Sequence, residues 1–550
     1  MIFPSPSAII ATLVIFGSLF AALRRPRTAC VLSLYLLALV VLSSAIKQAY
    51  LGVAMSLADV RFFLLAPREN FHIFIQYPLL GLALLGVGAG FALCVVAGLR
   101  YERPVHFMVS APHGHRFRIT AAAVSLMLAI GATMMPGEGI RAQVMQDEMY
   151  AAYQTMNEME RITGVINRLN FFFNNRIVQA SLPAFHQQTR FEVPAPSATA
   201  ALAGIQPDIF MILEESTFDP TLISGCAASD CDNAMLHPLP LALRTQQGPL
   251  MVHSSGGGTW LSEFALMSGF DWRVFGYSGA YAPVSLAPRL QTTLPAKLRA
   301  LGYRTIALYP TEGNFLSAKS AYGFYGFEEF YAASDLKLPK DWELTYDHMV
   351  FDKALALAQN PADTRPVFIF ALTVRNHGPH GNGMVQVAAG FHAAEQQQGG
   401  ALADYLGRMR DSSTDFVRLA EQWLQSPRPR IVGWFGDHQP EAAWKFTQHP
   451  ERLLRDNVAI NASDKQIPFL TQYQLSANFG EQGQLLSKSA LDISYLGTQL
   501  LAFAGLPLDA GASAGRAVAA KCNGLMLECS DHELINDYLS YRIYQLAEMH

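Results

Sequence analysis

Four long apolar runs lie within the first 135 residues of this 550-residue chain. They occupy roughly residues 8–23, 29–46, 77–99 and 119–135. Each run is long enough, or nearly so, to cross the ~30 Å hydrocarbon layer of a bilayer as a helix. Hydrophobic residues make up 51% of the chain, which is high for a soluble protein, and the excess is concentrated here. The sequence therefore predicts a transmembrane bundle of about four helices over residues 1–136.

Basic residues indicate the orientation of this bundle. Arg24, Arg25 and Arg27 follow the first run, and a second basic group, residues 100–118, follows the third. Because cytoplasmic loops carry the excess of Arg and Lys, we expect both loops inside the cell and both ends of the bundle outside. The first run has no basic residue before it, so we interpret it as a retained span rather than a cleaved signal. An apolar piece at residues 62–66 could lie in the membrane interface or form a fifth element.

A short apolar stretch that begins at Pro207 runs directly into two carboxylates, Glu214 and Glu215. The stretch is too short for a helix, so the pattern indicates a buried strand with acids at its carboxyl end. A second apolar strand stops on Asp437 and His438. In open α/β sheets ligands bind beyond the carboxyl ends of the strands, so we expect these side chains to face a site.

Short apolar strands alternate with helical stretches after residue 206. The expected strands are residues 209–213, 304–308, 366–372 and 431–435. This alternation predicts an α/β domain with a largely parallel sheet between helices over residues 206–510. Residues 137–205 have a helix-compatible pattern that ends in proline-rich punctuation, which predicts a juxtamembrane helical stalk and linker. Residues 492–506 are apolar at helical spacing, and residues 511–550 contain a cysteine pair and an amphipathic helix from about Asp531.

Six cysteines divide by region. Two lie in apolar runs and four form close pairs in the polar part of the chain: Cys30, Cys94, Cys226 with Cys231, and Cys522 with Cys529. In a domain outside the cytosol, close pairs predict two local disulfides. A four-thiolate zinc site is the alternative, although neither pair has the two-residue spacing that such sites favour.

A glycine run, Gly256 to Gly258, precedes Thr259 and an apolar helix-like segment. Glycine permits close approach of the backbone to a phosphate, and the N–H groups at the start of the following helix would face that phosphate. Taken alone, the run fits a flexible loop equally well. Together with the strand-end acids and the imidazole of His438, however, Thr259 completes a set of donors suited to a divalent metal and a coordinated alkoxide.

This order of motifs resembles the alkaline phosphatase and sulfatase superfamily over roughly residues 206–507. Thr259 with Glu263 four residues later is most similar to the membrane-bound lipoteichoic-acid-synthase-like phosphotransferases. The resemblance implies that one divalent ion, Mn²⁺, Mg²⁺ or Zn²⁺, is held by four residues: Glu215, Thr259, Asp437 and His438.

Glu215 is preferred over Glu214 as the ligand, because Ser216 follows it as a serine follows the strand-end glutamate of the family.

The same resemblance implies further site residues. His377 matches a histidine that contacts substrate or protonates a leaving group, a role suited to a side chain whose charge changes near neutral pH. A water-exposed loop histidine is the alternative reading, and His380 is a weaker candidate. Asn376, Lys319 and Glu263 are candidate substrate-binding residues. Lys319 lies where relatives carry an arginine and would contact phosphate as a point charge.

His449 lies eleven residues after His438, a position similar to that of the second-zinc histidine of phosphoethanolamine transferases. The surrounding sequence does not match that family, so we expect His449 at the surface.

The resemblance implies a bacterial inner-membrane enzyme whose catalytic domain lies in the periplasm or extracellular space. Thr259 would accept a head group, phosphoglycerol or else phosphoethanolamine, from a phospholipid donor and pass it to an envelope glycan or lipid acceptor. A phosphodiester hydrolase that uses water as acceptor is an alternative, although a sulfatase is disfavoured because Thr259 cannot become formylglycine. A catalytically silent binding protein is a third. The net charge of -4 gives no basic footprint, so we exclude nucleic acid as a partner.

Overall fold

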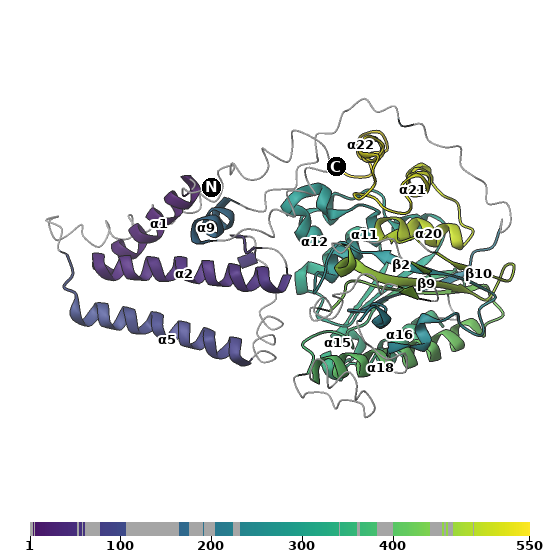
Figure 1. Ribbon diagram of the computed structural model, residues 1–550, viewed down its shortest axis with the longest axis horizontal. Coiled ribbons are helices and arrows are strands. Elements are labelled where there is room, and N and C mark those ends of the chain that lie inside the picture. The colour runs from purple at the N-terminus through teal and green to yellow at the C-terminus, as the bar shows by residue number, and fades with distance from the viewer. Residues whose placement is uncertain are drawn as a thin grey trace. The chain divides into compact units, whose positions relative to one another are not determined.

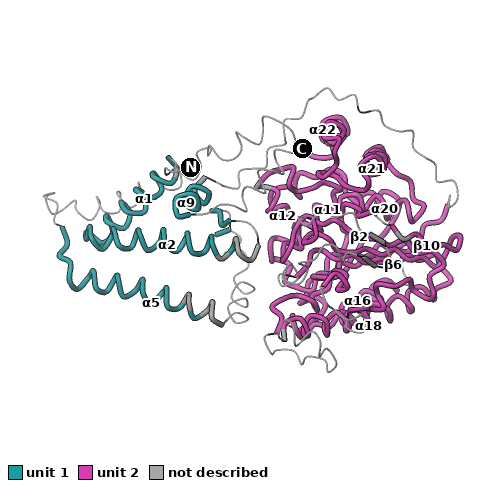
Figure 2. The backbone as a smooth tube through the Cα atoms, in the orientation of Figure 1, with its two compact units in different colours: residues 1–146, 154–179 teal, residues 147–153, 180–550 magenta. Residues whose placement is uncertain are grey.

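The chain divides into two compact units, residues 1–146 with 154–179, and residues 147–153 with 180–550 (Figure 2). The computed structural model describes residues 4, 6–51, 54–57, 59–60, 78–105, 164–174, 191, 204–223, 231–339, 342–359, 363–381, 400–440, 454–455, 458–459, 466–487 and 489–550. The two units are described separately below. The predicted span at residues 119–135, the apolar piece at residues 62–66, most of the predicted stalk and His449 lie outside the described residues.

The first unit contains apolar helices. Its described helices are α1 (Pro6–Leu23), α2 (Pro26–Leu51), α5 (Pro78–Tyr101) and α9 (Val165–Asn174). Helix α2 packs against α1, α5 and α9. Within the described residues, the segment Pro26–Ala45 of α2 is long and apolar enough to cross a membrane, whereas Ala8–Leu23 and Leu85–Tyr101 are shorter apolar segments. The structure thus supplies one candidate span by length and composition, and the four-helix bundle stays a prediction.

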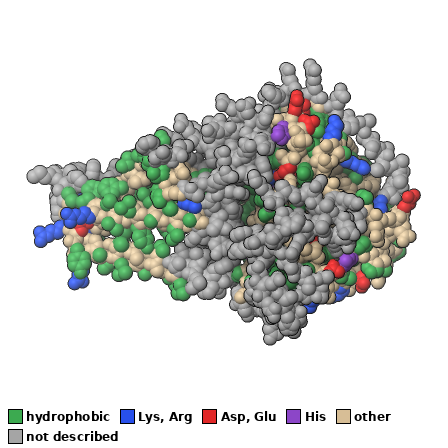
Figure 3. Space-filling view, in the orientation of Figure 1, with side chains coloured by type: hydrophobic (Ala, Val, Ile, Leu, Met, Phe, Trp, Pro, Cys, Tyr) green, Lys and Arg blue, Asp and Glu red, His purple; other side chains and the backbone are tan. Residues whose placement is uncertain are grey.

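Apolar side chains cover much of the surface of α1, α2 and α5 (Figure 3). Leu85 is 71% exposed and Leu93 is 68% exposed. A soluble monomer rarely exposes a continuous apolar surface of this kind, which marks a membrane or protein contact. At one end, the turn between α1 and α2 meets the end of α5: Arg25 Nε donates to the Glu102 carbonyl at 2.7 Å, and Thr28 N donates to Glu102 Oε2 at 2.7 Å. The described start of the second basic group, residues 100–105, therefore lies beside the first, and the orientation of the bundle stays a prediction.

The second unit is built on one nine-stranded sheet in the order β10-β2-β9-β6-β1-β5-β3-β4, with β11 also paired to β2 (Figure 1). The strands are β1 (Asp208–Glu214), β2 (Arg244–Met251), β3 (Arg304–Tyr309), β4 (Glu329–Ala332), β5 (Val367–Leu372), β6 (Arg430–Gly436), β9 (Leu470–Ala477), β10 (Gly483–Leu486) and β11 (Leu491–Asp492). Strand β9 runs antiparallel to β2 and β6, and the other pairings are parallel. The predicted mostly parallel sheet is confirmed, and the four expected strands are β1, β3, β5 and β6. A separate pair joins β7 (Leu454–Arg455) to β8 (Val458–Ala459).

Helices cover both faces of this sheet, α15, α16 and α18 on one side and α11, α20, α21 and α22 on the other (Figure 1). The bounds are α11 (Thr259–Ser268), α12 (Ala282–Ser285), α13 (Leu294–Ala300), α14 (Ala318–Tyr325), α15 (Ala333–Leu336), α16 (Asp347–Ala358), α18 (Gly400–Leu424), α20 (Leu496–Phe503), α21 (Ala510–Lys521) and α22 (His532–Ser540). Every residue of β1 is buried because both faces of this central strand are covered, which explains its unbroken apolar sequence. Phe210 of β1 contacts the ring of Trp423 from α18 edge-on, with ring centroids 5.5 Å apart.

The C-terminal part of the second unit is helical and contains a disulfide. The apolar segment after residue 492 forms a short 3-10 helix and then α20, and Asp531 caps α22 by accepting a hydrogen bond from Leu534 N at 3.0 Å. Cys522 and Cys529 form a disulfide with a Cα–Cα distance of 5.0 Å. Cys231 is also disulfide-bonded, and Cys226, its expected partner, lies outside the described residues.

Candidate metal centre

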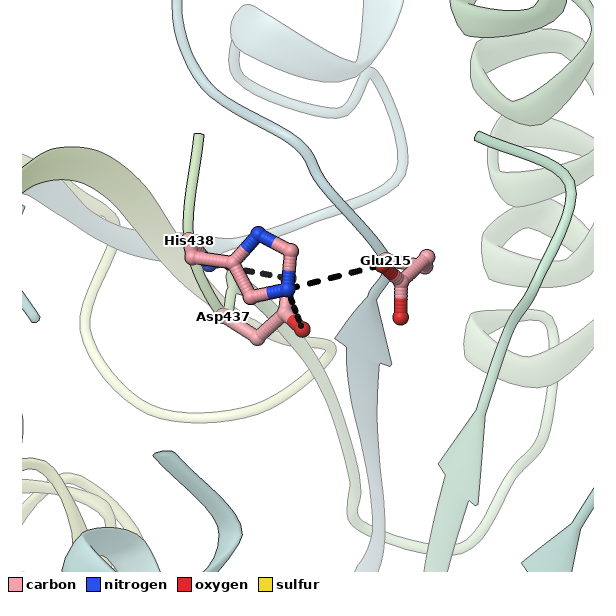
Figure 4. Close-up of side chains that lie close together, drawn as sticks. All are labelled: Glu215, Asp437 and His438. Carbon is pink, nitrogen blue, oxygen red and sulfur yellow. Dashed lines mark hydrogen bonds and ion pairs between the residues drawn. The ribbon is translucent and has the colours of Figure 1, made fainter. Parts of the chain in front are cut away.

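Glu215, Asp437 and His438 lie together at the carboxyl ends of β1 and β6 (Figure 4). The two strands are parallel neighbours, and Glu214 pairs with Gly436, so the residues that follow each strand emerge side by side. One donor atom from each of the three side chains lies within 4.8 Å of the others, and all three residues are buried. His438 Nε2 is 3.2 Å from Asp437 Oδ2 and 3.6 Å from Glu215 Oε1. The three predicted ligands thus converge, although they come from segments more than 200 residues apart.

The turn after β1 aims Glu215 at this cluster. Ser216 adopts a left-handed conformation with a φ of 49°, which costs a non-glycine residue roughly 1–2 kcal/mol. In this conformation its N–H donates to Asp437 Oδ1 at 2.8 Å, and its hydroxyl donates to Glu215 Oε1 at 2.8 Å. Gly436 permits the turn to approach β6, because a Cβ at that position would lie 1.7 Å from the Thr217 carbonyl oxygen. The two strand ends are therefore locked to each other.

The donor set fits a divalent cation. His438 Nδ1 lies 2.9 Å from the Gln439 carbonyl, a contact that requires Nδ1 to carry the proton and leaves the Nε2 lone pair directed at the carboxylates. Asp437 Oδ2 is buried and accepts no hydrogen bond from the described residues. Two carboxylates and a neutral imidazole nitrogen are ligands that Mn²⁺, Mg²⁺ and Zn²⁺ accept to different degrees. A cation is the group that would satisfy the unpartnered oxygen and the facing lone pair together.

Burial and mutual repulsion perturb the titration of the cluster. Burial, reinforced by the nearby Glu215 charge, raises the pKa of Asp437 to about 7. Burial lowers the pKa of His438, but the carboxylates of Asp437 and Glu215 outweigh this effect and raise it above its usual value. Because a cation binds the deprotonated forms of both groups, these upward shifts make cation binding compete with protons.

Thr259 is the first residue of α11 and its hydroxyl reaches the cluster. Oγ1 donates to Glu215 Oε2 at 3.2 Å and lies 3.4 Å from His438 Nε2. The preceding Gly258 has a φ of 90°, a conformation that a residue with a Cβ adopts only with strain. The hydroxyl of Ser262, one turn into α11, donates to the Asp437 carbonyl at 2.6 Å and ties the helix to the same strand end. The N-terminus of α11 and the Thr259 hydroxyl consequently face the cluster.

Glu214, the alternative ligand, is not part of the cluster. Successive side chains of a strand point to opposite faces, and Glu214 Oε2 accepts a hydrogen bond from Thr373 Oγ1 at 3.1 Å instead. Burial raises the pKa of Glu214 well above its usual value, and the nearby Asp347 adds to the shift. The structure therefore places Glu215, and not Glu214, beside Asp437 and His438.

His377 follows β5 and packs its ring against Trp342, with ring centroids 4.2 Å apart. Its Nδ1 lies 2.5 Å from the Gly378 carbonyl, so Nε2 is left as an acceptor. Burial lowers the pKa of His377 to about 4, and the nearby His438 contributes to the decrease. The predicted role of His377 at the site stays a prediction. The weaker candidate, His380, is held by the Asn376 carbonyl at 3.0 Å.

Asn376 is buried, and its side chain is hydrogen-bonded to the turn that follows β1. Its Nδ2 donates to Thr217 Oγ1 at 3.0 Å, and its Oδ1 accepts from Ser412 Oγ at 3.3 Å. The Thr217 hydroxyl in turn donates to the Glu215 carbonyl at 3.0 Å. Both ends of the amide are thus engaged by protein groups. The side chain supports the turn that carries Glu215, and its predicted contact with substrate stays a prediction.

The two remaining candidates differ in exposure. Glu263 is 4% exposed on α11, and burial raises its pKa to about 8, so its carboxyl is largely protonated at neutral pH. Its expected contact with substrate stays a prediction. Lys319 is exposed near the start of α14, and no side-chain contact in the described part of the chain joins it to the metal ligands. Its phosphate contact stays a prediction. Ser262 and Trp342 were not singled out by the sequence as site residues, because no motif distinguishes them, and Ser216 entered only as the neighbour that favoured Glu215.

Comparison with known proteins gives a family for this domain. Residues 207–479 match the family model described as Sulfatase. A protein of Haemophilus influenzae, described only as uncharacterized, is 30% identical over 361 residues, which cover 63% of this chain and 62% of the relative. A Rhizobium meliloti protein named "Putative cyclic beta-1,2-glucan modification protein" is 25% identical over 259 residues, which cover 45% of this chain and 37% of the relative. The match thus spans less than two thirds of the length of either relative.

Among solved structures, the chain is similar to Streptococcus pyogenes phosphoglycerol transferase GacH in complex with sn-glycerol-1-phosphate. The identity is 19% and the TM-score 0.45, over 62% of this chain and 88% of that one.

Proposed function

We propose that this chain, whose residues 207–479 form a sulfatase-family domain, is a metal-dependent phosphotransferase that moves a phospholipid head group to an envelope glycan or lipid. The observation that carries the proposal is the position of the Thr259 hydroxyl, 3.2 Å from Glu215 Oε2 and 3.4 Å from His438 Nε2. A hydroxyl at the start of a helix, beside a cluster fit for a divalent cation, is the arrangement that covalent phosphoryl transfer requires.

The cation would be held by Glu215, Asp437, His438 and Thr259. When bound, a divalent cation lowers the pKa of a neighbouring hydroxyl and offsets negative charge on phosphoryl oxygens. The chain's own contributions are positional. The N–H groups of the first turn of α11 face the same region and can donate to phosphoryl oxygens. Glu215 accepts the hydrogen bond that orients the Thr259 hydroxyl.

The proposed transfer takes two steps, and bonds and protons balance in each. In the first, Thr259 Oγ1 forms a bond to phosphorus, the phosphorus–oxygen bond to diacylglycerol breaks, and the proton lost by Thr259 is matched by one gained by the departing oxygen. In the second, an acceptor hydroxyl forms the new bond to phosphorus, and Thr259 leaves and regains a proton. We assign proton transfer in both steps to His377, whose pKa rises from about 4 when an anionic phosphate lies beside it.

Phosphoglycerol is the head group we propose first, with phosphoethanolamine second. The name of the Rhizobium meliloti relative supports a glycan acceptor. The candidate span at Pro26–Ala45 supports anchoring next to a lipid donor, and the Cys522–Cys529 disulfide supports an oxidising compartment outside the cytoplasm. We therefore propose a bacterial inner-membrane location with the catalytic domain outside.

Turnover of head-group-labelled phospholipid by the full-length protein in detergent with Mn²⁺ tests this function. The wild type should release diacylglycerol and label an added glycan, and Thr259→Ala should do neither. Thr259→Ser, which keeps a hydroxyl, is the matched control and should retain measurable turnover. Mass spectrometry of protein quenched without acceptor should find the head-group phosphate on Thr259. Labelled product in water alone would favour the hydrolase, and equal turnover by Thr259→Ala would refute the proposed nucleophile.

A further inference from the structure

A second buried cluster lies close to the metal centre in sequence. His253 follows β2, six residues before Thr259, and its side chain is fully buried between two carboxylates. Nε2 is 3.0 Å from Asp492 Oδ1 and 3.5 Å from Asp271 Oδ2. Asp492 ends β11, and Asp271 follows the end of α11. His253 is therefore tied to the segment after α11 and to the segment that leads into α20.

Unlike the metal centre, this cluster contains a positively charged side chain, Arg273. The Arg273 guanidinium contacts Asp271 through Nη2 at 2.6 Å and Nε at 2.9 and 3.0 Å, and its Nη1 lies 3.3 Å from Glu528 Oε1. Within the described part of the chain, the ion-pair partner of Glu215 and Asp437 is His438, and neither acid pairs with a Lys or Arg. An arginine that chelates one carboxylate opposes binding of a metal there and leaves His253 as the partner of the other. A guanidinium thus already partners one of the two carboxylates that flank His253.

The segment between His253 and Thr259 is held at both ends. Trp272 Nε1 donates to the His253 carbonyl at 3.2 Å. Three residues later, Gly256 N donates to the Gln439 carbonyl at 2.9 Å, the same oxygen that lies 2.9 Å from His438 Nδ1. The glycine loop therefore runs from the His253 cluster to the backbone beside the metal ligands, and Thr259 follows after Gly257 and Gly258, which have φ values of 153° and 90°. Glycine restricts the backbone little, so the hydrogen bonds at the two ends of the loop determine the position of the Thr259 hydroxyl.

We propose that His253 is a positioning residue for the nucleophile: clamped between Asp492 and Asp271, it fixes the start of the glycine loop and so holds the Thr259 hydroxyl against the metal ligands. This inference rests on the proposed function, since it assigns Thr259 as ligand and nucleophile. His253 touches no reacting atom. Its effect is transmitted through the loop, and a displacement of about 1 Å at a reacting group costs on the order of 100-fold in rate.

Mn²⁺ titration calorimetry on the full-length protein in detergent tests the clamp without any substrate, by comparing four proteins: wild type, Thr259→Ala, His253→Gln and the double variant. Loss of a ligand or of its support weakens metal affinity roughly 10- to 100-fold. We expect Thr259→Ala and His253→Gln each to weaken Mn²⁺ binding by about tenfold, and the double variant to bind no more weakly than Thr259→Ala alone. A merely structural role for His253 would give additive losses.

Turnover supplies the second readout: His253→Gln should lower kcat about 100-fold and leave KM for the lipid within about threefold. His237→Gln is the matched control, because His237 pairs with Asp232 at 2.8 Å on the surface, and it should behave as wild type. Asp492→Asn is an isosteric second variant in case His253→Gln fails to fold; it keeps the acceptor for Ser494 N and should show the same loss of affinity in smaller degree.

Three outcomes would overturn the proposal. Wild-type affinity and turnover in both His253→Gln and Asp492→Asn would refute the clamp and leave the proposed function intact. Two Mn²⁺ ions per wild-type chain, with one lost in Asp492→Asn, would identify the cluster as a second metal site instead. A wild type that binds no Mn²⁺ and turns over no lipid would refute the proposed function, and the clamp with it.

Discussion

Replacing Glu215 by glutamine should have opposite effects on the cation-free and the cation-bound protein. Donor oxygens of Glu215 and Asp437 lie within 4.8 Å of each other. At an effective dielectric constant near 20, two full charges at that separation repel by about 3.5 kcal/mol. Protonation of Asp437, whose pKa is raised to about 7, relieves part of this repulsion. We therefore expect Glu215→Gln to stabilise the cation-free protein by about 1–2 kcal/mol at pH 8.

The same substitution should weaken cation binding, because it removes a charged ligand. We expect at least ~100-fold weaker Mn²⁺ binding, equivalent to about 2.7 kcal/mol. The amide keeps one oxygen, which can accept the hydrogen bond from Ser216 and so hold the turn, whereas the hydrogen bond from Thr259 to the other carboxylate oxygen is lost. Titration calorimetry measures the affinity, and thermal unfolding in EDTA and in Mn²⁺ measures the two stabilities.

Glu214→Gln is the matched control for this experiment. Glu214 is the neighbouring acid, its side chain bonds to Thr373, and burial raises its pKa well above the usual value. Because its carboxyl lies outside the cluster of metal ligands, Mn²⁺ affinity should stay within about threefold of wild type. The reasoning fails if Glu215→Gln binds Mn²⁺ as wild type does, if it destabilises the EDTA-treated protein, or if Glu214→Gln weakens binding as much.

Three further predictions follow from the same geometry. Mn²⁺ affinity should rise about tenfold per pH unit up to about pH 7, where Asp437 loses its proton, and then level off. The stability of the cation-free protein should fall as pH rises over roughly pH 4–7, since the folded state binds that proton more tightly than the unfolded state. A flat affinity profile in calorimetric titrations would contradict this. His377→Gln should lower turnover of labelled lipid roughly 100-fold without changing Mn²⁺ affinity, and a parallel loss of affinity would instead make His377 a metal ligand. Gly436→Ala should destabilise by at least ~1–3 kcal/mol in thermal unfolding, because its Cβ would meet the Thr217 carbonyl at 1.7 Å, whereas Gly483→Ala, in open space on β10, should not; equal effects would refute the close approach.

The central strands were predictable because they are buried on both faces. β1, β5 and β6 read as unbroken apolar runs for this reason. β2 and β9 escaped prediction because they carry polar side chains that only their pairing satisfies. Gln474 Nε2, for example, donates to Gln247 Oε1 at 2.7 Å and to the His237 carbonyl at 2.8 Å. A buried glutamine whose partners lie more than 200 residues away leaves no local signal.

The metal ligands were predictable as residue types at strand ends, since the carboxyl ends of parallel strands meet at one edge of a sheet. The choice of Glu215 over Glu214 depends on which way the turn at Ser216 directs each side chain. The role of Asn376 depends on Thr217 and Ser412, to which it is bonded and which the sequence did not associate with it.

The sequence by itself determined the types of the candidate site residues and their order along the chain: an acid after one strand, a hydroxyl after a glycine run, and an Asp-His pair after another strand. The tertiary structure decided which of these groups meet and in what protonation state. Burial leaves His377 neutral and Glu263 largely protonated, and it places His253 between two carboxylates contributed by distant segments. The physical reason is that a pKa and a hydrogen-bond partner depend on the groups that surround a side chain in space, and those groups are brought together only when the chain folds.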